Sequence, residues 1–552
     1  MTDGNTKVQD RAPACDDTAT VTAAAPAAPA DVDAAAPGPA EQKHPTATPG
    51  SKKRGHEGWD GNEKVRSDVK RQRPPGRGRR EPREGGTDSD GDDKEARRPK
   101  RKAACLIGYC GTGYYGMQMN PPFKTIEGDL FAALVGAGAI SKDNSNDPKK
   151  TSFMRAARTD KGVHAAGNVI SAKLIIEDAD IVSKINALLP PTVRVWGVTQ
   201  VTKRFDCRKH CGSRIYEYLI PSFSFLSPRP TSGFGKRLKE MDALYPGITR
   251  PDPEGEKFWA DVYAKLEAAG IGKDDVYEDY MAMLREKTLL PKSESEEKPL
   301  LMPEEQWLKF KTIKEIEDET RRSYRISPER VDGIRKALKV FEGSHNFHNF
   351  TLKKRYEDPS SRRFMKDLSV SEPKLIDGTE WLSIKIHGQS FMLHQIRKMI
   401  CMVTQVIRTG APLTRISDAF GKTRISIPKA PALGLLLEQP VYESINDRLQ
   451  SFGREGLSFE PYKAEMEAFK STHIYDKIYA VEVKENTFHA FFNFIDSYKE
   501  GKSLDYFTAK GLSDGETGAG KEGATADPSE FEDDEDREEL NEKVDNDANN
   551  EG

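Results

Sequence analysis

Apolar and polar positions follow two different periods between residues 103 and 225. Four apolar runs, rich in β-branched and aromatic residues, predict strands at 103–110, 168–176, 193–201 and 213–221. Helical spacing between these runs predicts two helices, at 125–140 and 180–190, the first capped by Thr125 and the second ended by Pro190. Strands that alternate with helices over short connections predict a domain of mixed α and β structure.

A second half with similar patterning follows at 323–449. Here the pattern predicts helices at 327–343 and 390–410 and strands at 380–388 and 430–442. The first helix has Ser327 as its cap and Pro328 at its first position. Between the halves, residues 226–322 are highly charged and contain several prolines, which predicts an insertion with short helices. Residues 450–504 predict a helical C-terminal extension.

Both ends of the chain lack apolar periodicity. Residues 1–102 are rich in alanine, proline, glycine and charge and end in a basic block at 63–102, whereas residues 505–552 are acidic. Such segments cannot bury enough apolar surface to offset the entropy of ordering, so both are predicted to be disordered. Their opposite charges largely cancel, so the net charge of the whole chain is only −3.

The composition bears on the compartment as well. No apolar run approaches the eighteen or so residues that span a bilayer, and no signal peptide opens the chain, so we expect no membrane insertion. Six scattered cysteines are typical of a reducing compartment. Basic clusters at 70–80 and 97–102 indicate a nuclear address, an RNA-binding arm, or merely solvated charge; we favour the first two together.

The segment "FMRAARTDKGVHAAGNVIS" at 153–171 places many charges directly before an apolar run. Arg155 and Arg158 lie three residues apart, and Asp160 opens a turn that ends at Gly162. A carboxylate this close to a core needs a cation or a hydrogen-bond donor, or its pKa rises. Taken alone, the turn favours a structural aspartate; with matching groups elsewhere in the chain, it favours a catalytic one.

The motif "GTGYYG" at 111–116 matches the spacing of a dinucleotide-binding loop. Such a loop requires a helix that starts at its third glycine, but "MQMNPPFK" with two prolines follows here. The context therefore favours a glycine turn beside a binding cleft.

Two later segments supply candidate partners for Asp160. In "SRIYEYLIP", side-chain alternation puts Arg214, Tyr216 and Tyr218 on one side of a strand, which suits either a cross-strand ladder or stacking on a base. In the helix predicted at 390–410, Arg397 lies on a mainly apolar stripe, where an arginine is seldom buried without an acidic partner. Asp160 is the economical choice for that partner. His394 and Lys398 fall on a more polar stripe that we expect at the surface or facing RNA.

The segment "EGSHNFHNFT" at 342–351 interleaves His345 and His348 with phenylalanines. No further ligand set for zinc accompanies them, so RNA contact or a polar network in the core is the better interpretation. The basic segment at 353–363 is of the kind that grips phosphates, although ordinary solvated charge explains it nearly as well.

Together these segments closely resemble the TruA-type tRNA pseudouridine synthases in their eukaryotic multisite form. The resemblance covers about 103–449, interrupted by the insertion, and continues more weakly to about 498. It rests on five blocks in the family's order: "RAARTDKGVHA", "RIYEYLIPSFSF", "FEGSHNFHNFT", "GQSFMLHQIRKM" and "PKAPALGLLLE". Two departures are Cys401, where the family often has glycine, and the longer insertion at 226–322.

The resemblance implies a role for each candidate residue. Asp160 corresponds to the catalytic nucleophile, and Arg397 to the arginine that pairs with it. Tyr216 corresponds to the tyrosine that stacks on the flipped uracil and assists proton removal. Arg158 corresponds to the arginine that pushes the target nucleotide out of its stack.

The resemblance also implies a fold and an activity. The fold class is α+β: two related α/β halves, at 103–225 and 323–449, that share an extended antiparallel sheet with a central basic cleft. The activity is the isomerisation of tRNA uridines to pseudouridine, without a cofactor or a metal. A non-catalytic RNA-binding or chaperone protein on the same scaffold is the alternative. Expected partners are tRNA and, as further candidates, mRNA or snRNA; the expected state is a nuclear monomer, with a homodimer as the alternative.

Overall fold

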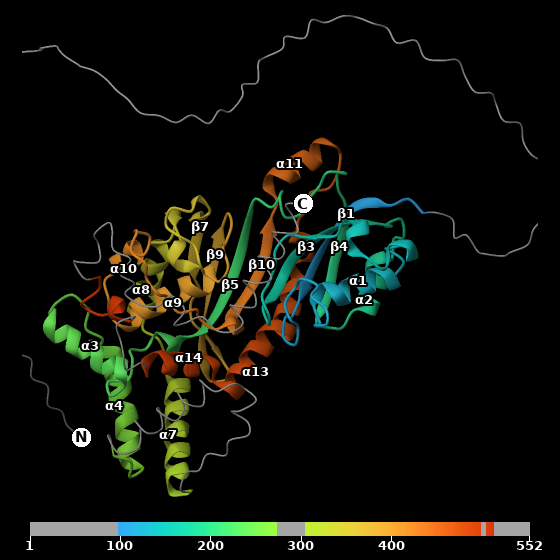
Figure 1. The fold of residues 1–552 in the computed structure, drawn as a ribbon. Helices are drawn as coiled ribbons and strands as arrows, with labels where there is room; N and C mark the ends of the chain where they lie inside the picture. Colours follow the sequence, from blue (N-terminus) through green and yellow to red (C-terminus); the bar gives the residue numbers. More distant parts are fainter. Residues whose placement is uncertain (1–97, 273–303, 498–503, 513–552) are drawn as a thin grey trace, which may run out of the picture. The chain divides into compact units, whose positions relative to one another are not determined.

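A single mixed sheet dominates the computed structural model, which describes residues 98–272, 304–497 and 504–512 (Figure 1). Its strands run in the order β4-β1-β3-β10-β5-β9-β7-β6, with β2 paired to β3 and β8 to β9. Their bounds are β1 Arg101–Tyr109, β2 Met154–Arg155, β3 His164–Leu174, β4 Val193–Gln200, β5 Ser213–Pro221, β6 Gly343–Asn346, β7 Arg362–Val370, β8 Lys374–Ile376, β9 Thr379–Gly388 and β10 Leu435–Val441. The predicted strands are all present.

The late strand β10 joins the two halves of the sheet. It pairs in parallel with β3, where Leu436 lies opposite His164, and antiparallel with β5, where Leu437 lies opposite Tyr216. The implied antiparallel sheet is therefore mixed at this one junction among the described strands. A consequence is that the start of β3 and the middle of β5 lie at the same level of the sheet.

Helices cover the sheet in both halves. In the N-terminal half they are α1 Ile126–Gly136 and α2 Ile181–Leu188; in the C-terminal half they are α8 Pro328–Lys339, α9 Gln395–Arg408, α10 Thr414–Asp418 and α11 Glu443–Ser451. The predicted caps are confirmed, because Thr125 accepts a hydrogen bond from the Gly128 amide and Ser327 accepts one from the Arg330 amide. The helix predicted at 390–410 begins only at Gln395, after His394 at φ 56°.

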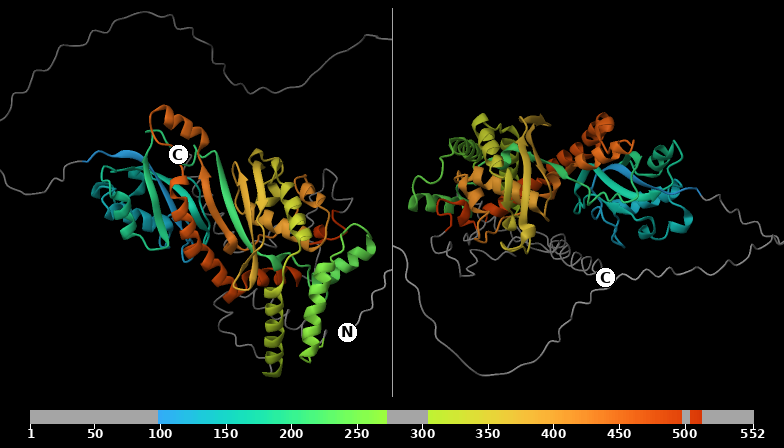
Figure 2. Two further views of the ribbon diagram at one scale, coloured as in Figure 1. Left: turned by 180° about the vertical axis from the view of Figure 1, so that it is seen from behind. Right: turned by 90° about the horizontal axis from the view of Figure 1, so that it is seen from above.

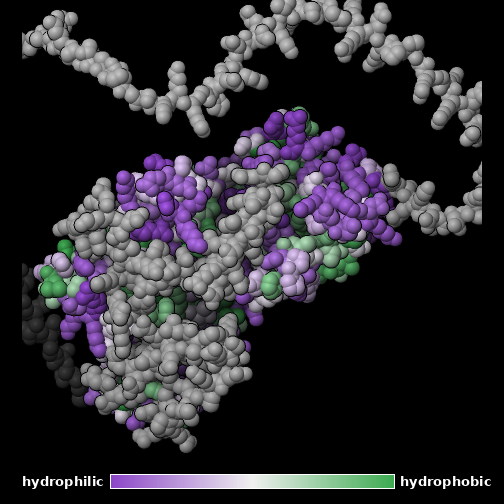
Figure 3. All heavy atoms as spheres, viewed as in Figure 1, coloured by the Kyte–Doolittle hydropathy of each residue, from purple (hydrophilic) through white to green (hydrophobic). Residues whose placement is uncertain are grey.

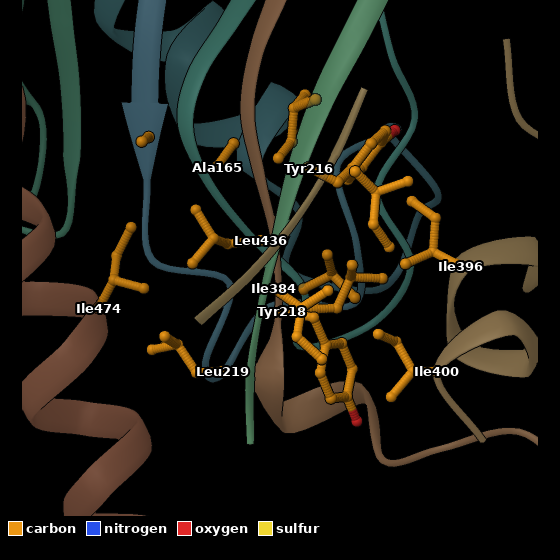
Figure 4. Close-up of a cluster of buried hydrophobic side chains, with 14 of the residues drawn as sticks. Ala165, Tyr216, Tyr218, Leu219, Ile384, Ile396, Ile400, Leu436 and Ile474 are labelled. Carbon is orange, nitrogen blue, oxygen red and sulfur yellow. The ribbon is translucent and has the colours of Figure 1, made fainter. Parts of the chain in front are cut away.

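The helical extension lies across the sheet between the halves (Figure 2). It comprises α12 Lys463–Phe469, a π-helical turn at Lys470–Tyr475, α13 Asp476–Glu485 and α14 Thr487–Asp496. Figure 4 shows the core that results: Tyr216 and Tyr218 of β5 face Ile396 and Ile400 of α9, whereas Ile474 approaches from the opposite side. Both faces of the central strands are thus buried.

The insertion forms longer helices than its composition predicts. They are α3 Gly233–Leu244, α4 Pro253–Ala268 and α7 Glu304–Ser323, of which α4 and α7 lie side by side (Figure 1). Two polar contacts reach α7: Arg229 forms an ion pair with Glu317, and Lys265 of α4 donates to the Thr320 hydroxyl at 3.0 Å. Part of the charge of the insertion therefore holds its elements together. None of the helices in the described ranges is long and apolar enough to cross a bilayer.

The acidic tail, predicted to begin at residue 505, needs a boundary correction. Leu504–Leu512 has a defined place, with Phe507 fully buried. Arg237 of α3 donates to both oxygens of Asp505 at 2.8 Å each. Aromatic residues and one paired acid anchor this short segment. The prediction missed it because the acidic composition was assessed over the whole tail. The prediction that 1–102 is disordered lies outside the described residues up to residue 97, and its end is too late, because Arg101 and Lys102 belong to β1.

Candidate active site

Asp160 lies in a tight turn immediately before β3. The Val163 amide donates to the Asp160 carbonyl at 3.1 Å, and Gly162 takes a φ of 75°, which glycine adopts without strain. The Asp160 side chain is 28% exposed, so its carboxylate is accessible from one side. The predicted turn at the mouth of a strand is confirmed.

The glycine-rich segment 111–116 packs against this turn. A Cβ on Gly111 would lie 2.2 Å from the Val163 carbonyl oxygen, so only glycine fits there. The Gly111 amide donates to Nδ1 of His164 at 3.1 Å, and the Met117 amide donates to the Thr159 carbonyl at 3.1 Å. The segment acts as a brace for the Asp160 turn, and the next helix, α1, begins only at Ile126.

A buried polar cluster supports the residues that flank Asp160. The hydroxyls of Tyr109 and Thr159 lie 2.9 Å apart, and the Asn168 amide donates to the Tyr109 hydroxyl at 3.2 Å and to the Ala157 carbonyl at 3.0 Å. Thr159 and Asn168 are 7% and 0% exposed. This cluster was not predicted, although Asn168 inside an apolar strand is a signal for it.

Tyr216 projects from β5 toward the same region. Its ring packs edge-on against Phe391 at 5.1 Å between ring centroids. Burial raises the pKa of Tyr216 to about 12; Arg214 lowers it, and the negative charge of Asp160 raises it further. Asp160 and Tyr216 are therefore close enough to interact electrostatically, and the phenol is neutral at physiological pH. The neighbouring Arg214 donates to the Ala156 carbonyl at 2.8 Å.

Tyr218 and Arg397 both fix the segment that precedes β10. The Tyr218 hydroxyl donates to the Pro431 carbonyl at 2.7 Å, and Nε of Arg397 donates to the Ala430 carbonyl at 2.6 Å. Arg397 is half-buried in α9. The ion pairs of the described ranges include none between Arg397 and Asp160. The pairing of these two residues stays a prediction.

Arg155 and Arg158 occupy different environments. Arg155 forms an ion pair with Glu127, which is 2% exposed, and donates to Gln118 Oε1 at 2.9 Å. Arg158 is exposed two residues before Asp160. Burial raises the pKa of Glu127, and the charges of Arg155 and then Arg158 oppose that rise. Arg155 thus belongs to the scaffold, whereas Arg158 lies at the surface beside the carboxylate.

His394 lies beside the carboxylate of Asp160. Its Nδ1 lies 3.6 Å from Asp160 Oδ2, and its side chain is 2% exposed. The expectation that His394 and Lys398 lie at the surface was wrong, since Lys398 is also only 8% exposed; the alternative, that they face RNA, stays a prediction. For His394 the error came from extending the helix to Ser390: residues before Gln395 are outside α9, so helical spacing does not place their side chains.

The two histidines of segment 342–351 pack against aromatic rings, His348 against Tyr356 with centroids 5.4 Å apart. His345 shares a hydrogen bond with the Glu342 carbonyl at 2.7 Å and stacks on Phe420 with centroids 4.3 Å apart. Asn346, which lies between the two histidines in the sequence, donates from its side-chain amide to the Tyr356 carbonyl at 2.8 Å. This hydrogen bond connects the segment to the basic segment 353–363. Among the described residues, no group of three or more histidine, cysteine or acidic side chains could hold a metal ion.

Hydrophilic side chains gather on the face shown in Figure 3, over β7 and around α11. In β7 they include Arg362 and Arg363, which end the basic segment 353–363, and Lys366. Lys354 in that segment pairs with Asp358 at 2.7 Å. The predicted central basic cleft stays a prediction.

Comparison with known proteins relates the chain to enzymes that modify tRNA. The family described as tRNA pseudouridine synthase matches residues 337–443. The tRNA pseudouridine synthase 1 of Yarrowia lipolytica is 55% identical over 427 residues, which cover 76% of this chain and 78% of that protein. The protein of the same name from Saccharomyces cerevisiae is 49% identical over 411 residues, covering 74% and 73%. The tRNA pseudouridine(27/28) synthase of S. cerevisiae is 40% identical over 354 residues, covering 63% and 85%.

Proposed function

The chain belongs to the TruA-type tRNA pseudouridine synthase family, and from this premise we propose that Asp160 is the catalytic carboxylate. The protein is an isomerase that converts uridines of tRNA to pseudouridine. The environment of the Asp160 carboxylate is the main support for this assignment. This carboxylate is held at the start of β3, is 28% exposed, and lies within electrostatic range of the Tyr216 ring.

The reaction suits a single ionised carboxylate. The N1–C1′ bond of uridine breaks, the uracil turns, and a C5–C1′ bond forms; C5 loses a proton and N1 gains one. No electrons are exchanged with another molecule. A carboxylate takes part in this chemistry as a nucleophile at C1′ or C6, or as the base that forms a glycal. In each case Asp160 has to be ionised and close to the detached base.

Tyr216 is the stacking residue of the proposed site. Its ring is 9% exposed and packs edge-on against Phe391, so it would offer a flipped base a rigid aromatic face. The raised pKa keeps the phenol protonated. Tyr216 therefore acts mainly by holding the uracil, and its hydroxyl is a poor proton acceptor.

The two arginines of the predicted site act differently from each other. Arg158 is exposed next to Asp160 and enters the RNA stack in place of the flipped nucleotide, which costs a few kcal/mol to extrude. Arg397 supplies positive charge from α9, and binding of RNA would bring it to Asp160. Its hydrogen bond to Ala430 holds it in the free protein.

Further parts of the proposal concern partners and location. Basic residues of β7 and of the segment 353–363 would contact RNA phosphates, with a salt-dependent affinity. The clusters at 70–80 and 97–102 support residence in the nucleus, and a fluorescent fusion that lacks 51–102 yet enters the nucleus would contradict this. We further propose that the enzyme also acts on mRNA or snRNA and that it is a monomer. Sedimentation of the full chain tests the monomeric state.

The test of Asp160 is a single substitution in the full chain. Asp160→Asn keeps the shape of the side chain and removes its charge. Unmodified tRNA transcripts are incubated with each protein, and pseudouridine is mapped chemically. We expect product from the wild type, none from Asp160→Asn, and similar tRNA affinity for both. Product from the variant would overturn the role of Asp160, and binding without product from either protein would favour the RNA-binding alternative.

A further inference from the structure

His394 stands behind the carboxylate of Asp160. Its Nδ1 lies 3.6 Å from Asp160 Oδ2, and the histidine side chain is 2% exposed where that of Asp160 is 28% exposed. One side of the carboxylate therefore faces a buried imidazole, while the other side is open. A buried imidazole is a hydrogen-bond donor to an adjacent carboxylate whenever the facing nitrogen carries its proton.

The backbone directs His394 toward Asp160. His394 has φ 56° and ψ 5°, in the left-handed region that only a few per cent of non-glycine residues adopt, most often asparagine, aspartate and histidine. Neighbouring hydrogen bonds hold this turn: the Thr351 hydroxyl donates to the Leu393 carbonyl at 2.9 Å, and the Met392 amide donates to Gln395 Oε1 at 2.9 Å. Backbone strain of this kind persists only where the surrounding structure fixes it, and it is concentrated at functional sites.

We propose that His394 is a positioning residue for Asp160, its Nδ1–H directed at Oδ2 of the carboxylate. The inference rests on the proposed catalytic role of Asp160. A carboxylate facing Nδ1 selects the tautomer, or the cation, that carries a proton there. The distance of 3.6 Å exceeds that of a hydrogen bond, and such contacts shorten when substrate closes a site.

Two of the arginines around the site donate to backbone carbonyls: Nε of Arg397 to Ala430 at 2.6 Å and Arg214 to Ala156 at 2.8 Å. The imidazole of His394 is a buried group that faces Oδ2 of Asp160, and it is therefore placed to set the direction of that oxygen. A fixed direction matters because a nucleophile displaced from its line of attack loses much of its rate.

Two substitutions separate the donor from the backbone turn. His394→Asn keeps a donor nitrogen at the position of Nδ1, and asparagine tolerates the left-handed region. His394→Gly keeps the turn but removes the donor. Asp377→Gly is the matched control, since Asp377 has φ 46° in the turn between β8 and β9, outside the proposed site. The measurement is the single-turnover rate of pseudouridine formation on a tRNA transcript, together with the dissociation constant of that tRNA.

We expect His394→Gly to lose about 10- to 100-fold in rate, the equivalent of a hydrogen bond to a charged group, with tRNA affinity unchanged. His394→Asn should recover most of that rate, and Asp377→Gly should match the wild type. Full activity in His394→Gly, or equal losses in the glycine and asparagine variants, would overturn the proposal.

A spectroscopic measurement covers the case in which His394→Gly does not fold. In full-length protein with ¹⁵N-labelled histidine, the Nδ1 resonance of His394 should shift in Asp160→Asn; an unchanged resonance contradicts the contact. Activity in Asp160→Asn would instead contradict the catalytic role of Asp160. A failure of the His394 proposal is therefore distinguishable from a failure of the proposed role of Asp160.

Discussion

Lys470 and Glu217 form a buried ion pair on the face of the sheet opposite Tyr216. The Lys470 ammonium lies 3.3 Å from Glu217 Oε2 and 2.9 Å from Glu438 Oε2, and the Lys470 and Glu217 side chains are 2% and 5% exposed. Although burial opposes it, the charges of Glu217 and Glu438 raise the pKa of Lys470. Because Glu217 directly follows Tyr216 in β5, this pair anchors the C-terminal extension behind the proposed site.

Removing the Lys470 charge should strongly destabilise the fold. Lys470→Met leaves the buried Glu217 and the half-buried Glu438 without this cation, which we expect to lower the free energy of unfolding by about 3–5 kcal/mol. Urea denaturation followed by circular dichroism measures the change. Lys463→Met is the control, since Lys463 is 67% exposed and pairs only with exposed Glu460. Equal midpoints for the two variants would contradict the anchoring role.

Gly111→Ala should impair the reaction more than it impairs RNA binding. The added Cβ would lie 2.2 Å from the Val163 carbonyl, so the turn that carries Asp160 has to move. A displacement of about 1 Å reduces a rate by about 100-fold, and this is the loss we expect in kcat. Steady-state kinetics and tRNA binding measure it. Gly113→Asn, at φ 83° with no atom within 4 Å of the added Cβ, should stay active.

Tyr216→Phe should retain most activity. Tyr216→Ala should lower the rate by about 10- to 100-fold, which corresponds to the stacking free energy of one base. The reason is that burial, with the charge of Asp160, raises the pKa of Tyr216 to about 12, so the neutral ring is the working form. The rate of pseudouridine formation between pH 6 and 9 should therefore show no step that Tyr216→Phe removes. Such a step would indicate that the phenolate takes a proton.

The two arginines before Asp160 should separate stability from activity. Arg155→Ala leaves Glu127 buried without its ion pair and should lower the free energy of unfolding by about 2–3 kcal/mol. Arg158→Ala should change it by less than about 0.5 kcal/mol, as is usual for exposed positions, yet lose most product. Thermal unfolding and pseudouridine mapping on the same two proteins distinguish these outcomes. The reverse pattern would exchange the proposed roles.

The sequence predicted those features that depend on neighbours along the chain. The turn at Asp160 and the cap Thr125 follow from local residue types, and both are observed. The five family blocks identified the activity, which the comparisons show. Contacts between distant segments could not be predicted: the Tyr475 hydroxyl donates to Glu217 across 258 positions of sequence. His394 was misplaced for a different reason, because its position depends on where α9 starts.

Glu482 should make stability depend on pH. It is 4% exposed in α13 and accepts the Phe488 amide at 3.0 Å, and burial raises its pKa to about 7 from an ordinary 4.5. The folded state thus holds its proton more tightly than the unfolded state. The stability from this group is fully present below pH 4.5 and is lost as the pH rises through 7.

Glu482→Gln should therefore flatten this dependence, because the amide keeps the acceptor oxygen and never ionises. At pH 8 we expect the variant to be more stable than the wild type, by on the order of 2 kcal/mol, and at pH 4.5 to be similar. Urea denaturation at both pH values measures the difference. Glu485→Gln is the control, because Glu485 is exposed on the same helix and should change nothing. A Glu482→Gln variant that is no more stable at pH 8 would show that this carboxylate is ionised and satisfied in the folded protein.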